Sequence, residues 1–138
     1  MSDRTLNILL VEDDEVDVMN VRRAFERNNV SNPLYVAGNG LEALEMLRDG
    51  TVPTERRLIL LDLNMPRMNG IEFLQALRAD PELSSAPVVV LTTSNDDQDK
   101  IDAYNLNVAG YLLKPVTFSN FCERMTTLNK YWTLVEMP

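Results

Sequence analysis

The residues of this sequence that could carry out chemistry follow short apolar runs. Two carboxylates come directly after the first run, and another carboxylate, a hydroxyl and an amine come after later runs: Glu12, Asp13, Asp62, Thr92 and Lys114. Three carboxylates that converge would repel one another unless a cation neutralised them. Ligation by oxygen alone favours a hard cation such as Mg²⁺. A lysine and a hydroxyl beside such a cation would suit the oxygens of a phosphoryl group.

The composition excludes several other kinds of chemistry. The chain has no histidine, which removes histidine acid–base catalysis, Ser–His and Cys–His nucleophile pairs, and His-ligated zinc or haem. The single cysteine, Cys122, allows no internal disulfide and no thiolate cluster, as is typical of the reducing cytoplasm. Any chemistry must therefore use carboxylates, hydroxyls and lysines, with or without a metal ion.

The spacing of apolar residues predicts the elements that would position these groups. Apolar runs without internal alternation are typical of strands buried on both faces, and helical crossovers between them imply a parallel sheet. The predicted strands are 6–11, 34–37, 58–61, 87–91 and 110–113, and the predicted helices are 16–27, 41–48, 71–79, 96–107 and 117–132. We therefore expect an α/β fold, a doubly wound five-stranded parallel sheet with its functional crevice beyond the carboxyl ends of the strands.

Length and charge predict a single domain over residues 1–138, with a core at about 6–128 and an apolar tail at 129–138. A chain of 138 residues, 45% of them hydrophobic, is large enough for one core but not for two. The formal net charge of −8 disfavours binding to nucleic acid or to an anionic membrane. No apolar run approaches the roughly 18 residues of a membrane span, and the start of the chain is too short and polar for a signal peptide. We expect a cytoplasmic protein.

Each candidate residue also has a plainer structural interpretation. Asp13 or Asp14 can cap the helix after the first strand. Thr92 can be a turn hydroxyl, and Lys114 can be a solvated surface lysine. Asp62 is a poor cap because the next helix begins only after a loop that contains a proline. Each signal is weak alone, but four of them at four strand ends favour a shared site.

Four segments carry a resemblance to a known family. They are LLVEDD (9–14), LLDLNMPRMNG (60–70), VVVLTT (88–93) and GYLLKP (110–115). In order, position and spacing they resemble the receiver domain of two-component response regulators, and the resemblance covers roughly residues 6 to 128. It implies a (βα)5 flavodoxin-like fold of the CheY-like kind.

The resemblance also implies a phosphoacceptor and a Mg²⁺ site. Asp62 would accept the phosphoryl group and contribute to metal binding. Asp13 would bind Mg²⁺ directly, with Glu12 as a companion that acts through water, and the backbone carbonyl of Asn64 would be a further ligand. Asp14 falls one position past the acidic pair and is predicted to start the first helix.

Three further residues are implied to recognise the phosphoryl group and to respond to it. The Thr92 hydroxyl and the Lys114 ammonium would engage phosphoryl oxygens, and Tyr111 would change rotamer together with Thr92. The plainer interpretation of Tyr111 is ordinary packing at a strand end. Asn64 and Ser94 would tune the rate of dephosphorylation.

The function implied by the resemblance is that of a switch rather than an enzyme. A sensor histidine kinase would donate the phosphoryl group from a phosphohistidine, and the chain would catalyse only its own phosphorylation and dephosphorylation. Phosphorylation would reshape the surface of residues 96–128, built by the fourth helix, fifth strand and fifth helix. With no effector domain expected after the receiver, the output would be contact with a downstream protein or transfer to a histidine phosphotransfer protein.

The C-terminal tail at 130–138, KYWTLVEMP, is more apolar than a disordered terminus requires. Trp132 and Leu134 can fold back on the core, or they can form a partner surface. We favour the second interpretation, a homodimer or partner contact through the last helix and the tail. This ending is similar to that of small receivers that serve phytochrome-type sensor kinases.

Three other functions fit parts of the sequence. GNGLEA at 38–43 matches a dinucleotide fingerprint, but it follows the second strand, and 138 residues are few for a six-stranded dinucleotide fold. A haloacid-dehalogenase-like phosphatase would need an acid two residues after its nucleophile, where this chain has Asn64. A pseudo-receiver that binds partners without phosphorylation predicts a broken site, whereas every expected site residue is present.

Overall fold

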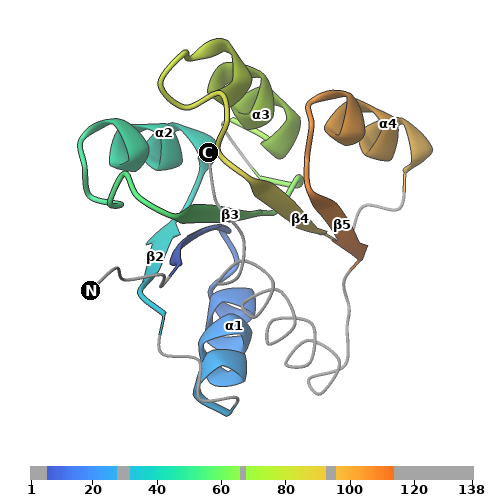
Figure 1. Cartoon of the computed structure of the whole chain (residues 1–138). Helices are drawn as coiled ribbons and strands as arrows, with labels where there is room; N and C mark the ends of the chain where they lie inside the picture. Colours follow the sequence, from blue (N-terminus) through green and yellow to red (C-terminus); the bar gives the residue numbers. More distant parts are fainter. Residues whose placement is uncertain (1–5, 28–31, 66–67, 93–95, 114–138) are drawn as a thin grey trace.

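Figure 1 shows the computed structural model of the chain, which describes residues 6–27, 32–65, 68–92 and 96–113. Five parallel strands form one sheet in the order β2-β1-β3-β4-β5. The strands are β1 (Asn7–Val11), β2 (Leu34–Ala37), β3 (Arg57–Leu61), β4 (Val88–Thr92) and β5 (Gly110–Leu113), and the helices are α1 (Glu15–Arg27), α2 (Gly40–Arg48), α3 (Gly70–Ala79) and α4 (Asp97–Asn105). None of these described helices is long and apolar enough to span a membrane. The predicted helix at 117–132 lies outside the described residues.

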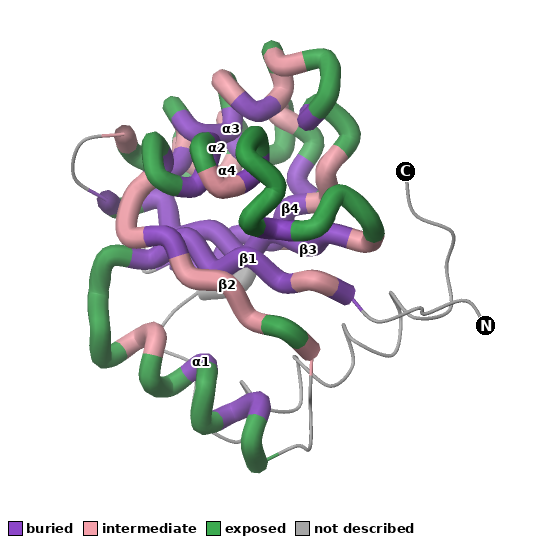
Figure 2. Tube along the Cα trace, turned by 90° about the vertical axis from the view of Figure 1, so that its left-hand side faces the viewer, coloured by how far each residue is buried: buried purple, intermediate pink, exposed green. Residues whose placement is uncertain are grey.

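Helices lie on both faces of the sheet, which confirms the predicted doubly wound architecture. In Figure 1, α1 lies below the sheet, whereas α2, α3 and α4 lie above it. Leu9 and Val11 of β1 belong to the core cluster on the α2 and α3 side, and Ile8 and Leu10 belong to the cluster on the α1 side. Figure 2 shows the buried central strands between these layers. The apolar runs have no internal alternation because both faces of the strands are buried.

Several element ends differ from the predicted ones, and two of these differences have clear local reasons. β4 begins at Val88 rather than Pro87, because a proline has no N–H for the ladder; only its carbonyl takes part, accepting from Ile59 N at 3.0 Å. α4 ends at Asn105 rather than 107, because Asn107 has a φ of 61°, in the left-handed region where a helix cannot continue. The other described elements begin and end within one residue of the predicted positions.

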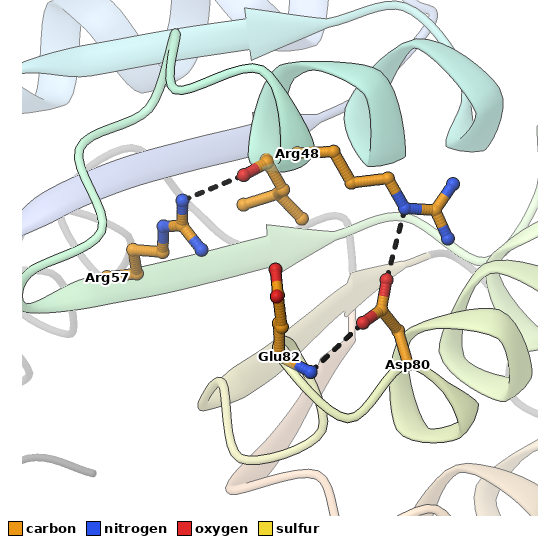
Figure 3. A network of polar contacts seen from close by, with 5 residues as sticks. Arg48, Arg57, Asp80 and Glu82 are labelled. Carbon is orange, nitrogen blue, oxygen red and sulfur yellow. Dashed lines mark hydrogen bonds and ion pairs between the residues drawn. The ribbon is translucent and has the colours of Figure 1, made fainter.

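The strand β3 starts on a buried arginine, which the apolar pattern did not predict. The Arg57 guanidinium donates to the carbonyls of Leu47 and Val52, both at 2.9 Å. Figure 3 shows Arg57 and, beside it, the ion pair between Arg48 and Asp80 at 3.1 Å. Arg57 therefore holds the segment between α2 and β3, which explains a charged residue at the start of a buried strand.

A second arginine, Arg78 of α3, ties together the loops that lead into β4 and β5. It donates to the carbonyls of Ser84 at 2.9 Å and Ala86 at 2.7 Å, and to those of Leu106 at 2.8 Å and Asn107 at 3.1 Å. Burial lowers the pKa of this guanidinium, but an arginine stays charged in proteins. The carboxyl-terminal end of α4 is thereby fixed to α3.

Replacing Arg78 with Met is expected to lower the free energy of unfolding by about 2–3 kcal/mol, because four carbonyls lose a charged donor. Arg78→Lys should recover only part of this loss, since an ammonium cannot span two loops as the guanidinium fork does. Urea denaturation followed by circular dichroism measures both variants. A Met variant as stable as the wild type would show that the four bonds contribute nothing net.

The helices α2 and α3 begin with the same pattern, Asn-Gly-apolar-Glu. The side-chain oxygen of Asn39 accepts from Glu42 N, and that of Asn69 accepts from Glu72 N, both at 2.9 Å. Both asparagines are therefore N-caps. At α3 the Glu72 side chain also accepts from Asn69 N at 3.2 Å, which completes a capping box. The fingerprint-like segment at 38–43 is thus a turn and a helix start.

Candidate functional site

The carboxyl ends of β1 and β3 bring three carboxylates together. The two strands are neighbours, with Val11 opposite Leu61, and Asp62 N donates to the Val11 carbonyl at 3.1 Å. One carboxylate oxygen from each of Glu12, Asp13 and Asp62 lies within 4.8 Å of the other two. The pairing of adjacent parallel strands is therefore what joins acids that are 49 or 50 positions apart in the sequence.

Two of the three carboxylates in this cluster are buried, which strengthens the repulsion between them. Glu12 and Asp62 are buried, with 4% and 6% of each residue's surface exposed, whereas Asp13 is exposed. Carboxylates gathered this closely repel one another unless a positive charge compensates them. Carboxylate oxygens are ligands that hard divalent cations prefer. The cluster could therefore hold a metal ion, reached from solvent on the side of Asp13.

Local hydrogen bonds separate the roles of the three consecutive acids. Asp14 Oδ1 accepts from Val16 N at 2.8 Å and from Asp17 N at 3.4 Å, which caps α1. The prediction that Asp14 starts the helix is confirmed. Glu12 Oε1 accepts from Asp14 N at 3.2 Å, so the same turn also orients the Glu12 carboxylate. Of the three consecutive acids, Glu12 and Asp13 thus belong to the cluster with Asp62, whereas Asp14 caps the helix.

The segment after Asp62 folds back on its carboxylate. Asn64 N donates to Asp62 Oδ1 at 3.2 Å, and Gly70 N donates to the Leu63 carbonyl at 3.0 Å. The start of α3 is thus bonded to the residue that follows Asp62. A cavity of about 430 Å³ adjoins this segment and the first turns of α4, lined by Leu63, Asn64, Met65, Asn69, Ile71 and Asp99.

The predicted hydroxyl and aromatic residues lie on β4 and β5. Thr92 is the last residue of β4 and fully buried, rather than following the strand as predicted. Tyr111 pairs with Val90 and is half-buried. Its ring centroid is 6.4 Å from that of Tyr104, and the Lys100 ammonium lies 5.9 Å above it. α4 therefore packs directly against the aromatic residue.

These contacts of Tyr111 with α4 were not predicted from the sequence. Lys100 and Tyr104 are four residues apart and so share one helix face, a signal that the polar composition of α4 obscured. Two predicted site residues, Ser94 and Lys114, lie outside the described residues, as does the tail at 130–138. The described part of the site consists of the three acids, the segment after Asp62, and the β4 and β5 residues.

The fold and the acidic cluster together are those of a receiver domain. Residues 8–126 match the response regulator receiver domain, and the chain belongs to this family, as its four motifs predicted. Receiver domains are phosphoacceptor switches that interact with histidine kinases and downstream targets.

Individual relatives are similar along most of the chain. The chain is 38% identical over 127 residues to the probable methanogenesis regulatory protein FilR2 of Methanothrix harundinacea, a match covering 91% of this chain and 82% of that protein. It is 35% identical over 128 residues to the response regulator Rcp1 of Synechocystis sp., covering 91% and 87% respectively.

Two solved structures have the same fold. The phosphorylated cyanobacterial phytochrome response regulator RcpA matches with a TM-score of 0.82 and 33% identity, covering 97% of this chain and 99% of that one. The Mn²⁺-bound form of Rcp1 matches with a TM-score of 0.79 and 34% identity, covering 96% and 99%.

Proposed function

We propose that this chain is a phosphorylation switch of a two-component system, in which Asp62 accepts a phosphoryl group from a sensor histidine kinase with the help of Mg²⁺. The observation that carries the proposal is the meeting of three carboxylates, two of them buried, at the carboxyl edge of the sheet. Membership of the receiver family and the Mn²⁺-bound relative support a divalent cation at this edge.

In the proposed reaction an oxygen of the Asp62 carboxylate attacks phosphorus and the phosphorus–nitrogen bond of the phosphohistidine breaks. The electron pair of that bond stays on the imidazole nitrogen of the kinase, and Asp62 becomes an acyl phosphate. Two hydrogen bonds orient the carboxylate: the main-chain N–H of Asp62 donates to the Val11 carbonyl, and the N–H of Asn64 donates to Asp62 Oδ1. These bonds fix the nucleophile before the donor arrives, which lowers the entropic part of the barrier.

Groups around Asp62 would stabilise the negative charge on the phosphoryl oxygens. The proposed Mg²⁺ ligands are Glu12, Asp13, Asp62 and the backbone carbonyl of Asn64. When bound, the cation would supply charge neutralisation for the phosphoryl oxygens. Thr92 would donate a hydrogen bond from its hydroxyl to one of these oxygens, and Lys114 would place an ammonium beside another. Asn64 and Ser94 would modulate the access of hydrolytic water.

The proposed output is a change in the surface formed by residues 96–128. A phosphoryl group that draws the Thr92 hydroxyl toward Asp62 would free space for the Tyr111 ring to move inward. The half-buried position of Tyr111 and its contacts with Lys100 and Tyr104 support this proposal. A rotamer change of Tyr111 would break those contacts and so alter the exposed face of α4.

The proposed partners are a kinase that donates the phosphoryl group and a protein that receives the signal. The similarity to Rcp1 and to the phytochrome response regulator RcpA supports a phytochrome-type sensor histidine kinase as the donor. The receiving partner would be a downstream protein or a histidine phosphotransfer protein. A homodimer through the last helix and tail is proposed from their apolar sequence alone.

Intact-mass spectrometry of the protein with Mg²⁺ and acetyl phosphate tests the proposed function. We expect a gain of one phosphoryl group that is lost when EDTA removes the metal ion. Steady hydrolysis of the donor without an adduct would instead favour a phosphatase of the haloacid-dehalogenase kind. No adduct together with no hydrolysis would leave a binding module and refute the phosphorylation switch.

A further inference from the structure

Two glycines occupy equivalent positions at the starts of α2 and α3. Gly40 and Gly70 each follow an N-cap asparagine and precede an apolar residue and a glutamate, and both are buried. Their local helix geometry is therefore matched. The two positions differ in what lies beside the glycine.

The surroundings of Gly40 leave room for adjustment. A Cβ added there would meet Met68 Cγ at 2.8 Å, Met68 Sδ at 2.9 Å and Phe73 Cβ at 3.1 Å. The two closest atoms belong to the outer part of a methionine side chain, which has three rotatable bonds and adapts readily. A movement of the Met68 side chain relieves the two shortest contacts of an alanine at this position, and the remaining contact with Phe73 Cβ at 3.1 Å requires a shift of only a few tenths of an ångström.

The surroundings of Gly70 are the backbone that carries the proposed phosphoacceptor. A Cβ added there would meet Leu63 Cα at 2.6 Å, Leu63 Cδ2 at 2.7 Å and the Asp62 carbonyl oxygen at 2.8 Å. A rotamer change of Leu63 would relieve only one of these three contacts. The other two require the main chain at 62–63 or the start of α3 to shift.

The start of α3 is the harder of the two to move. Both halves of the Asn69–Glu72 capping box are formed, and Phe73 in the first turn is fully buried. The main chain at Asp62 is held on its other side by the bond from its N–H to Val11. The main chain at Asp62 and Leu63 therefore lies between β1 and the first residue of α3, with no room for a Cβ between Gly70 and the Leu63 backbone.

We propose that Gly70 is a positioning residue for Asp62. Because Gly70 has no side chain, the start of α3 can pack directly against the main chain at 62–63 and hold the Asp62 carboxylate in its reactive position. The proposal rests on the proposed function of Asp62. The proposed role extends to the Asn64 carbonyl, because Asn64 follows directly after Leu63 in the chain. An alanine at position 70 therefore disturbs the nucleophile and a proposed metal ligand together, although it touches neither side chain.

The test compares Gly70→Ala with Gly40→Ala, the matched control at the other helix start. Both changes insert a better helix former than glycine, so effects on the helix itself should be similar. We expect Gly70→Ala to lower the rate of phosphoryl incorporation from acetyl phosphate and the affinity for Mn²⁺ by about 10- to 100-fold relative to Gly40→Ala. Intact-mass time courses measure the rate, and electron paramagnetic resonance measures free Mn²⁺.

A third measurement reports on position without any reaction. In nitrogen-15 correlation spectra of the metal-free proteins, the amide signals of Asp62, Leu63 and Asn64 should shift in Gly70→Ala and stay in place in Gly40→Ala. Equal rates, equal Mn²⁺ affinities and unchanged amide signals in the two folded variants would overturn the positioning role while leaving the function of Asp62 intact. A wild-type protein that takes up no phosphoryl group would instead refute the proposed function.

The folded state of each variant is checked first by thermal unfolding. If Gly70→Ala is unfolded in buffer, all three measurements are repeated for both variants in trimethylamine N-oxide, which favours the folded state. Reduced Mn²⁺ affinity of the refolded Gly70→Ala variant would support the positioning role. Failure to fold in either condition, with Gly40→Ala folded in both, would make Gly70 a purely structural residue and overturn the proposal.

Discussion

Replacing Asp62 with Asn is expected to reduce phosphoryl incorporation to below about one thousandth of the wild-type rate, because an amide offers no nucleophilic oxygen. The protein should remain folded, since the change keeps the size of a side chain that is 6% exposed and removes one charge from a crowded acidic cluster. Intact-mass spectrometry with acetyl phosphate and Mg²⁺ measures the adduct. Thermal unfolding of the same sample establishes that the variant is folded.

Asp14→Asn is the matched control for this loss. It removes the same charge from a position two residues from Glu12, but it leaves the three clustered carboxylates in place. Asparagine caps helices about as well as aspartate, so the bonds that Asp14 accepts from Val16 N and Asp17 N should persist. We expect phosphorylation at the wild-type rate. If Asp62→Asn takes up a phosphoryl group as fast as Asp14→Asn does, another residue is the acceptor.

Replacing Asp13 with Asn is expected to change stability in opposite directions with and without a divalent cation. In EDTA the variant should be more stable than the wild type by about 0.5–1 kcal/mol, because Glu12 and Asp62 lose a repulsive neighbour that is itself exposed to solvent. In Mg²⁺ the order should reverse, because binding of a cation to the folded state stabilises it in proportion to affinity. If Asp13 is a ligand, as proposed, its loss should lower that affinity at least tenfold.

Thermal unfolding at a series of Mg²⁺ concentrations measures both effects of Asp13→Asn in one experiment. The wild-type melting temperature should rise with Mg²⁺, and that of the variant should rise only at much higher concentrations. Asp14→Asn should follow the wild-type curve. If the Asp13 variant and the wild type respond identically to Mg²⁺, Asp13 is not a metal ligand and its closeness to Asp62 has another cause.

Much of the fold could be predicted because its strands are buried on both faces. The ends of β2 and β5 were predicted correctly from apolar runs bounded by glycine, proline and asparagine. The start of β4 and the end of α4 were missed because a missing N–H at Pro87 and a left-handed φ at Asn107 decided them. The buried Arg57 could not be predicted from periodicity, since its carbonyl partners come from the last turn of α2 and from the loop after it, which only the folded chain brings to β3.

The candidate site was predictable to the extent that it depends on sheet topology. Placing strands in parallel was enough to expect Glu12, Asp13 and Asp62 at one edge, although their roles in metal binding and phosphorylation stay predictions. The contact of Gly70 with the main chain of Asp62 was not predictable, because Gly40 has the same local sequence and lies against a side chain instead. Sequence specifies the helix start, but tertiary packing decides what it touches.

The sheet divides the apolar interior into two clusters, so substitutions on one face should have little effect on the other. Among the residues that the structure describes, the cluster around Val21 and Phe25 on the α1 side shares no side chain with the cluster around Phe73 and Leu77 on the other side, against which Tyr111 packs. Substitutions in two such groups combine nearly additively. The α1 side can therefore be redesigned for thermal resistance, or drift during evolution, with little effect on the packing around Tyr111 on the opposite side.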